Sequence, residues 1–156
     1  MKKTINLGVI GIDHGHIFDM LDEMLKEGCT CDYFWTEGEP LTLKEFNSKY
    51  PNIKRKENKK EILNDPSIDM ILISSVPKDR AHNSIEALKA GKDVMVDKPG
   101  CTTLDQLNKL KQTVKETGKI WSVNFSERFH VAAVAKAEEL VSEGKIGKVK
   151  QTIGTG

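Results

Sequence analysis

Short apolar runs alternate with segments of helical periodicity along most of this chain, and this alternation constrains its fold more than any other feature. The run "MILISSV" at 70–76 is apolar and bounded by turn residues, as in a strand buried on both faces of a sheet. Apolar residues recur at helical spacing from Ile17 to Leu25 and stop before Gly28, a suitable helix end. Strands that alternate with helices pair in parallel. The sequence therefore predicts a doubly wound α/β fold with a six-stranded, mostly parallel sheet.

The expected elements follow from the same pattern, with glycine and proline marking most of their ends. Strands are expected at 5–10, 30–36, 53–56, 70–76, 94–96 and 120–125, and a further strand begins at 148–153. Helices are expected at 17–25, 43–50, 59–63, 79–90, 103–117 and 131–143. The buried strands are expected to include 7–10, 71–74 and 94–96.

Composition excludes several classes of function. The chain has 156 residues, about the length of one domain, and a formal net charge of +1 from 24 basic and 23 acidic side chains. This balance provides no electrostatic attraction to nucleic acid or to an anionic membrane, so neither is expected as a partner. The three cysteines lack a paired motif, and no apolar run is long enough to cross a bilayer. We therefore expect a cytoplasmic protein.

The turn after the first strand is the first candidate for a binding site. It reads "GIDHGH" from Gly11 to His16, at the kind of strand–helix junction where dinucleotide-binding proteins carry Gly-x-Gly-x-x-Gly. Only Gly11 is in register, because Asp13 and His16 occupy the second and third glycine positions and Gly15 comes one residue early. Asp13 puts a carboxylate where phosphate oxygens would lie. The local sequence alone favours a role for Asp13 as the N-cap of the helix.

Two other strand ends carry charged groups. Glu37 follows the second expected strand, where an acidic residue commonly binds the ribose hydroxyls of a dinucleotide, and Glu39 is close by. No arginine is near in the sequence to bind a 2′-phosphate, which favours NAD over NADP. Two acids in a solvated turn explain the same pattern equally well. Asp97 and Lys98 follow the strand at 94–96, at the carboxyl edge of the sheet where ligands bind.

The segment "VMVDKPG" around these two residues resembles the Glu-Lys-Pro motif of the Gfo/Idh/MocA family of oxidoreductases. The resemblance covers nearly the whole chain in order. "DPSIDMILISSVP" is similar to the family's fourth strand, and "AHNSIEALKAGKDVMVDKPGCTTLDQL" is similar to the helix and motif that follow. Further along, the family's Asn-x-x-x-Arg-Phe and Gly-x-Ile-Gly-x-Val segments are matched by Asn124, Arg128, Phe129, Gly144, Ile146, Gly147 and Val149.

This resemblance implies a two-domain enzyme that transfers a hydride between NAD(P) and a sugar, polyol or related hydroxy compound. Residues 1–125 would form the NAD(P)-binding Rossmann domain. Residues 126–156 would form a connecting helix and the first strand of a substrate domain that is otherwise absent from this chain. The absent domain would supply the acid–base histidine and the interface of a homo-oligomer. We therefore expect an active full-length enzyme and an inactive fragment.

The resemblance also assigns site residues by position. Lys98 matches the family lysine near substrate and nicotinamide, and Asp97 replaces the adjacent glutamate, so both are candidate catalytic residues. The candidate cofactor-binding residues are Gly11, Ile12, Asp13, His14, Gly15, His16, Glu37, Pro77 and Lys98. No metal site is expected, because no cysteine or acid beyond Asp13 stands at ligand spacing from the two histidines.

Departures from the family pattern leave a second hypothesis open. Asp13 and His16 interrupt the phosphate loop. After the fourth-strand proline the family usually has Asn and then His, whereas this chain has Lys78, Asp79, Arg80 and Ala81, with His82 displaced. The alternative is a non-catalytic Rossmann-like module, a sensor or interaction protein whose loop has lost its function. Titration with the cofactor separates the two hypotheses.

Overall fold

The computed structural model describes residues 4–126 and 131–153. The chain divides into two compact units, residues 1–124 and 125–156. Two residues of the family resemblance, Arg128 and Phe129, lie outside the described residues. Within the described part of the chain, no helix combines the length and the apolarity that crossing a membrane requires.

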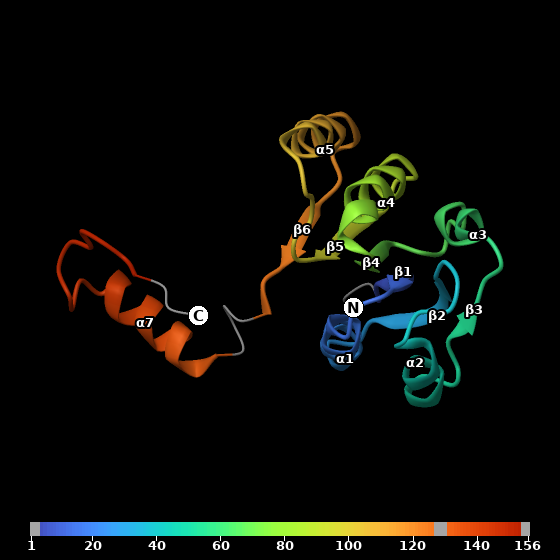
Figure 1. The fold of residues 1–156 in the computed structure, drawn as a ribbon, viewed down its shortest axis with the longest axis horizontal. Helices are drawn as coiled ribbons and strands as arrows, with labels where there is room; N and C mark the ends of the chain where they lie inside the picture. Colours follow the sequence, from blue (N-terminus) through green and yellow to red (C-terminus); the bar gives the residue numbers. More distant parts are fainter. Residues whose placement is uncertain (1–3, 127–130, 154–156) are drawn as a thin grey trace. The chain divides into compact units, whose positions relative to one another are not determined.

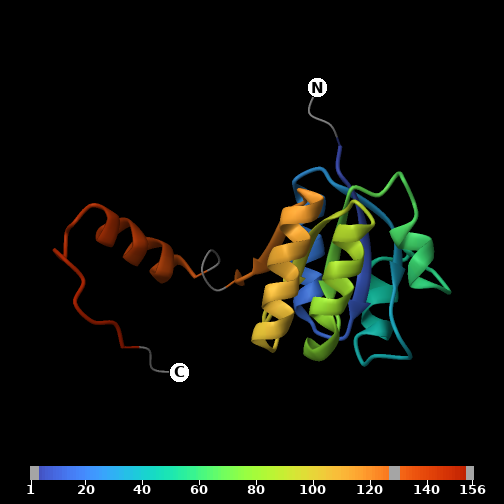
Figure 2. The same cartoon turned by 90° about the horizontal axis from the view of Figure 1, so that it is seen from above.

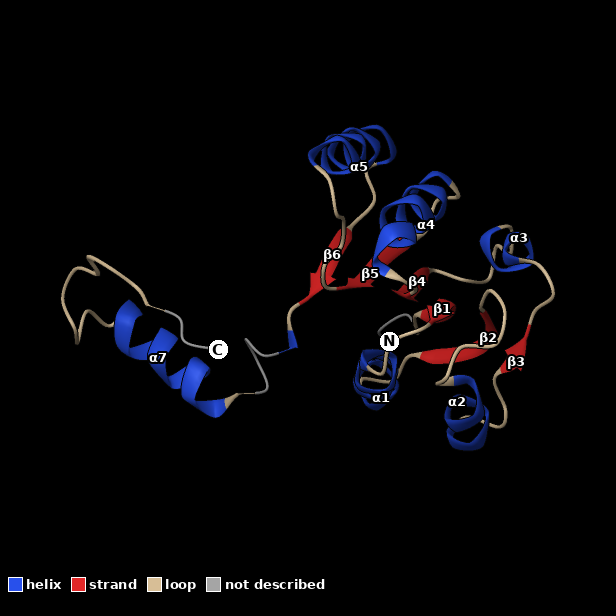
Figure 3. Cartoon of the chain, viewed as in Figure 1, coloured by secondary structure: helices blue, strands red, loops and turns tan. Residues whose placement is uncertain are grey.

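The first unit is built on one six-stranded sheet, drawn in red in Figure 3. Its strands are β1 (Asn6–Ile12), β2 (Thr30–Trp35), β3 (Lys54–Arg55), β4 (Met70–Ser74), β5 (Asp93–Asp97) and β6 (Trp121–Asn124). Their order is β3-β2-β1-β4-β5-β6, and every neighbouring pair is parallel. The predicted doubly wound fold is confirmed, and the sheet is entirely rather than mostly parallel.

Helices cover both faces of this sheet. They are α1 (His16–Lys26), α2 (Leu43–Lys49), α3 (Lys59–Leu63), α4 (Pro77–Lys89) and α5 (Leu104–Thr117). In Figure 1, α1 and α2 lie on one side of the sheet and α3, α4 and α5 on the other, and Figure 2 shows α4 and α5 side by side. Because side chains alternate along a strand, Ile71 and Ile73 of β4 enter one core and Leu72 enters the other.

Local signals set the ends of the helices. Thr103 caps α5, and its hydroxyl and the Gln106 side chain each bond the other's backbone N–H. Gly118 ends α5 in the left-handed conformation, with φ +65°. Helix α4 begins at Pro77, two residues before the expected start, because proline already has a helical φ and needs no hydrogen-bond acceptor in the first turn.

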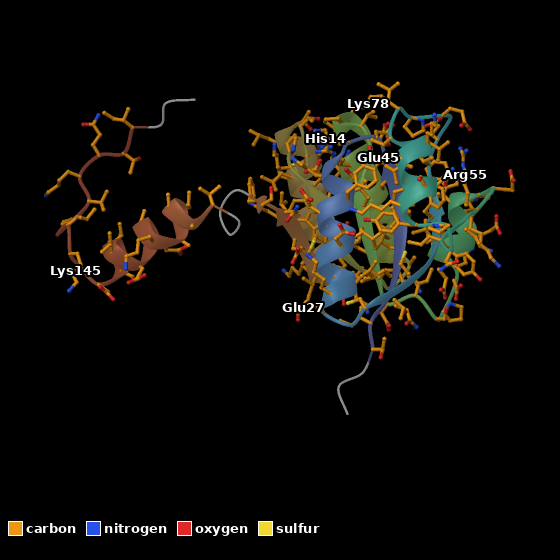
Figure 4. All side chains as sticks on the ribbon, turned by 90° about the horizontal axis from the view of Figure 1, so that it is seen from below. His14, Glu27, Glu45, Arg55, Lys78 and Lys145 are labelled. Carbon is orange, nitrogen blue, oxygen red and sulfur yellow. The ribbon has the colours of Figure 1, made fainter. Side chains whose placement is uncertain are left out.

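A parallel sheet of this order has a switch point between β1 and β4. The chain leaves these two strands in opposite directions, which leaves a crevice at their carboxyl ends. The β1–α1 turn, the β4–α4 turn and the end of β5 therefore meet at one edge. In Figure 4, His14 and Lys78 lie at this end of the unit and Glu27 at the opposite end.

The second unit contains helix α7 (Ala132–Ser142), within the range expected for a helix. The strand expected at 148–153 is not formed, and these residues are exposed. The physical reason is that a strand needs a hydrogen-bonding neighbour, and the described residues offer none to this segment. The assignment of 126–156 to a substrate domain stays a prediction.

The core of the first unit makes a direct test of the fold. Leu72 is fully buried between β1 and β5, whereas the side chain of Leu104 is 78% exposed. Leu72→Ala should lower the free energy of unfolding by about 2–5 kcal/mol in urea denaturation, because it leaves a cavity. Leu104→Ala should change it by no more than about 0.5 kcal/mol. Equal losses in the two variants would contradict this core.

Candidate functional site

The β1–α1 turn is fixed against the end of β4. Gly11 has φ +76°, and a Cβ atom there would lie 2.4 Å from Cβ of Ser75, so no larger residue fits. The backbone N–H of His14 donates to the carbonyl of Ser74 at 3.3 Å, and the Ser74 hydroxyl donates back to the His14 carbonyl at 3.2 Å. Gly11 therefore provides the tight turn out of β1.

The start of α1 differs from the expectation. The N-cap is Gly15, with φ −61° and no side-chain hydrogen bond, so the predicted N-cap role of Asp13 is wrong. Asp13 stands two residues too early for a cap, and its carboxylate interacts with the backbone of Val76 instead. Burial raises the pKa of Asp13, and the negative charges of Asp79 and Glu37 raise it further.

Asp97 lies at the centre of a buried polar cluster at the end of β5. Its side chain is 1% exposed. The His16 ring donates from Nδ1 to Oδ1 of Asp97 at 2.8 Å, and Nδ1 of His14 lies 3.5 Å from Oδ2. Nη2 of Arg80 lies 2.8 Å from the same Oδ2 and forms a buried ion pair with it. The structure thus brings together three candidate residues and Arg80.

Arg80 was not predicted as a site residue, yet it links the end of β4 to the end of β5 by hydrogen bonds. Its Nε donates to the Ser75 carbonyl at 2.7 Å, and its Nη1 donates to the Lys98 carbonyl. Burial lowers the pKa of Arg80, and the nearby Asp97 opposes this effect. The sequence held one usable signal, because Arg80 shares the helical spacing of the buried Ser84 and Ala87 on α4.

Two pockets meet along this edge of the sheet. The first, of about 160 Å³, extends from Gly11 to Trp35 and Glu37 at the end of β2. The second, of about 280 Å³, is lined by His14, Pro77, Arg80, Lys98 and Pro99. Both are also lined by Asp13, Ser75 and Val76. The two pockets therefore lie next to each other at the switch point and share these three residues, and the pair is called the cleft below.

The Glu37 end of the cleft is held by a network that the sequence did not indicate. Nζ of Lys59 donates to the Asn83 side chain at 2.8 Å and lies 5.6 Å from the centre of the Trp35 ring. The amide of Asn83 donates to the Ser75 hydroxyl at 3.1 Å. These contacts join α3, α4 and the β4 end around the first pocket.

One premise about this end is corrected by the structure. Because β3 pairs with β2, Arg55 lies beside the loop that carries Glu37. The Arg55 guanidinium donates to Glu39 at 2.7 Å and to the carbonyls of Thr36 and Gly38. An arginine is therefore near in space, although it is distant in the sequence.

The predicted residue Ile12 and the displaced His82 take different places. Ile12 is completely buried at the end of β1, and His82 is exposed and lines the first pocket away from Lys98. The expectation about metals was based on sequence spacing, and the structure adds an acid to the two histidines. Ligand-type atoms of His14, His16 and Asp97 lie within 4.8 Å of one another. Spacing could not indicate this group, because Asp97 stands at the end of β5, 81 residues from His16.

The strand order, the glycine turn after β1 and the cleft at the switch point define a Rossmann-type nucleotide-binding domain. Comparison with models of known families agrees. Residues 5–125 match the Gfo/Idh/MocA model, which describes an oxidoreductase family with an NAD-binding Rossmann fold. The chain belongs to this family.

Its relatives are similar over much of the chain. It is 33% identical to YdgJ, an uncharacterized oxidoreductase of Escherichia coli, across 96% of this chain and 42% of that protein. It is 36% identical to the scyllo-inositol 2-dehydrogenase (NAD(+)) of Bacillus subtilis, across 56% of this chain and 25% of that enzyme. A crystal structure of a protein from Erwinia carotovora atroseptica has a TM-score of 0.89 and 34% identity, across 94% of this chain and 44% of that one. The chain thus spans less than half the length of these relatives.

The buried ion pair makes a second testable prediction. Asp97→Ala leaves the Arg80 guanidinium buried without its partner, so it should lower the free energy of unfolding by about 3–5 kcal/mol in urea denaturation. Adding Arg80→Met should restore part of this loss, because no unpaired charge then remains buried.

Asp79→Ala is the matched control, because Asp79 pairs with the exposed Lys78 at 2.9 Å and its loss should change stability little. The account of Asp97 would be wrong if Asp97→Ala and Asp79→Ala had the same small effect.

Proposed function

We propose that this chain is the cofactor-binding part of a dehydrogenase that transfers a hydride between a nicotinamide dinucleotide and a hydroxyl-bearing substrate. The observation that carries the proposal is the cleft that crosses the switch point. It runs from Glu37 at one end to Lys98 at the other, with Asp13, Ser75 and Val76 between them. An extended ligand with two chemically different ends fits such a cleft.

The residues present are compatible with a dinucleotide. Gly11 allows the backbone to turn closely against Ser75, and nothing lies within 4 Å of where a Cβ of Gly15 would be, so the start of α1 is open on that side. Glu37 lines the first pocket and can accept hydrogen bonds from ribose hydroxyls. Asp13 is an unfavourable group, because its charge lies where the pyrophosphate would pass.

Lys98 is the proposed catalytic residue, because it lines the second pocket and carries an amine that can bind a substrate hydroxyl. A bound nicotinamide supplies the carbon that accepts or gives the hydride. The Lys98 ammonium would orient and polarise the substrate hydroxyl beside that carbon. Asp97 is buried against Arg80 and His16, so we propose a positioning role for it: it fixes the strand end that presents Lys98.

The substrate class is inferred from relatives. Their names include scyllo-inositol 2-dehydrogenase, myo-inositol 2-dehydrogenase and D-xylose dehydrogenase. We infer a polyol or sugar substrate for the whole protein. Because this chain spans less than half of these relatives, we also propose that a second domain supplies the proton-transfer group and the oligomer interface, and that 126–156 connects the two domains.

Titration with NAD tests the proposal at Asp13. A single negative charge near phosphate, partly screened by solvent, costs on the order of 1 kcal/mol, which is roughly tenfold in affinity. Asp13→Asn and Asp13→Gly should therefore both tighten NAD binding in calorimetry. Asp13→Asn keeps the side-chain size and is the matched control for the backbone freedom of glycine.

Two results would count against this proposal. Looser binding in both Asp13 variants would make the aspartate a favourable part of the site. Absence of NAD binding in the natural chain and in both variants would instead favour a non-catalytic module.

The choice between NAD and NADP gives a further prediction at Glu37. Relatives include enzymes named for each cofactor, and we propose NAD for this chain because the Glu37 carboxylate repels a 2′-phosphate. Glu37→Ser should raise the affinity for NADP relative to NAD by roughly tenfold or more. Glu57→Ser, at an exposed acid outside the pockets, should leave the ratio unchanged. If Glu37→Ser left the affinity ratio of NADP to NAD unchanged, Glu37 would not be part of the ribose site.

A further inference from the structure

A cluster of two imidazoles and one carboxylate stands at the Lys98 end of the cleft. Among the described residues, only His14, His16 and Asp97 form a group of three metal-ligand side chains whose ligand atoms all lie within 4.8 Å of one another. We propose that these three side chains bind one divalent transition-metal ion, such as zinc, cobalt or nickel. This proposal goes beyond the nucleotide site and does not require that NAD binds.

The distances suit a common ligand sphere. Nδ1 of His16 lies 2.8 Å from Oδ1 of Asp97, and Nδ1 of His14 lies 3.5 Å from Oδ2. Two ligand atoms that each lie about 2.1 Å from one ion are separated by about 3.0–3.4 Å in octahedral or tetrahedral geometry. The His16 separation, to Oδ1, falls just below this range, and the His14 separation, to the other carboxylate oxygen, falls just above it. An ion would replace the hydrogen that His16 now donates to Asp97, and that proton would pass to solvent.

The donor set selects the kind of ion. Imidazole nitrogens suit zinc, cobalt, nickel and copper, whereas magnesium and calcium prefer oxygen ligands. Two nitrogens and one carboxylate therefore favour a transition metal over magnesium. The site is also open, because the side chain of His14 is 52% exposed and lines the pocket that Lys98 shares. Free coordination positions would face this pocket, as they do in metal sites that take a further small ligand.

The positive charge of Arg80 opposes binding of a metal cation, and the position of its guanidinium limits this repulsion. Its Nη2 lies on the Oδ2 side of Asp97, which leaves Oδ1 on the side of His16. A second partner that fixes the orientation of a ligating carboxylate is common around metal sites, and Arg80 provides one. The negative charge of Asp13, which attracts Arg80, offsets part of the repulsion. We expect weaker binding than at a closed structural zinc site.

Zinc titration of the untagged chain in the absence of NAD tests the proposal. Calorimetry should give one ion per chain, and the proton NMR signals of the His14 and His16 rings should respond while that of His82 does not. Magnesium chloride should give no binding. Loss of an outer partner already lowers metal affinity by about 10- to 100-fold, so His16→Ala should lower zinc affinity by at least about tenfold, and His14→Ala should do the same.

His82→Ala is the matched control. Its ring is 70% exposed and lies 3.4 Å from Glu86 one helical turn away, so it represents a surface histidine with an acidic neighbour. Its zinc affinity should equal that of the natural chain. Circular dichroism identifies a variant that fails to fold, and the half-exposed His14 can be replaced with little risk to the core.

Three results would overturn the proposal: no zinc uptake by the natural chain, uptake that survives both His14→Ala and His16→Ala, or an equal loss in His82→Ala. Because NAD is left out, each of these results is independent of whether the nucleotide site functions.

Discussion

The buried ion pair between Arg80 and Asp97 is the interaction on which the rest of this site depends. Both side chains are almost completely excluded from solvent. Desolvating two charges is costly, and a buried pair often adds little net stability over apolar residues of similar size. Its effect here is on geometry. One guanidinium holds the carbonyls of Ser75 and Lys98 as well as the carboxylate, so the ends of β4 and β5 are fixed relative to each other. The position of Lys98 follows from this arrangement.

The acidic side chains around the β1–α1 turn make this turn less favourable for phosphate than a standard phosphate-binding loop. Asp13, Glu37 and Asp79 interact through their negative charges, and burial of Asp13 strengthens the effect. The start of α1, which could offer backbone donors to phosphate, faces this acidic side. Arg80 and Lys98 line only the other pocket, whereas Lys59, which lines the acidic one, is bound to Asn83 and Glu86. A dinucleotide would therefore gain more from its two ends than from its pyrophosphate.

The fold could be predicted from the sequence because its signals are local. The run at 70–76 and the helix ends at Gly28 and Gly118 depend on nearby residues, and these elements were located to within a few residues. The site could be predicted only in part. The positions of Glu37 and Lys98 in the sequence were enough to place them at strand ends. They did not indicate which other side chains lie near these strand ends. Strand pairing brings Arg55 to the Glu37 loop, and the crossover of β5 brings Asp97 to His16, 81 residues away. These contacts depend on side-chain geometry across the sheet.

Chemical-shift mapping of the ¹⁵N-labelled chain with NAD shows where on the fold the dinucleotide binds. If it binds in the cleft, the largest changes will fall on the amides of Gly11, Glu37, Ser75 and Lys98, from one end of the cleft to the other. Changes confined to the hollow of about 440 Å³ beside α2, around Lys44, would exclude binding in the cleft, as would no change at saturating NAD.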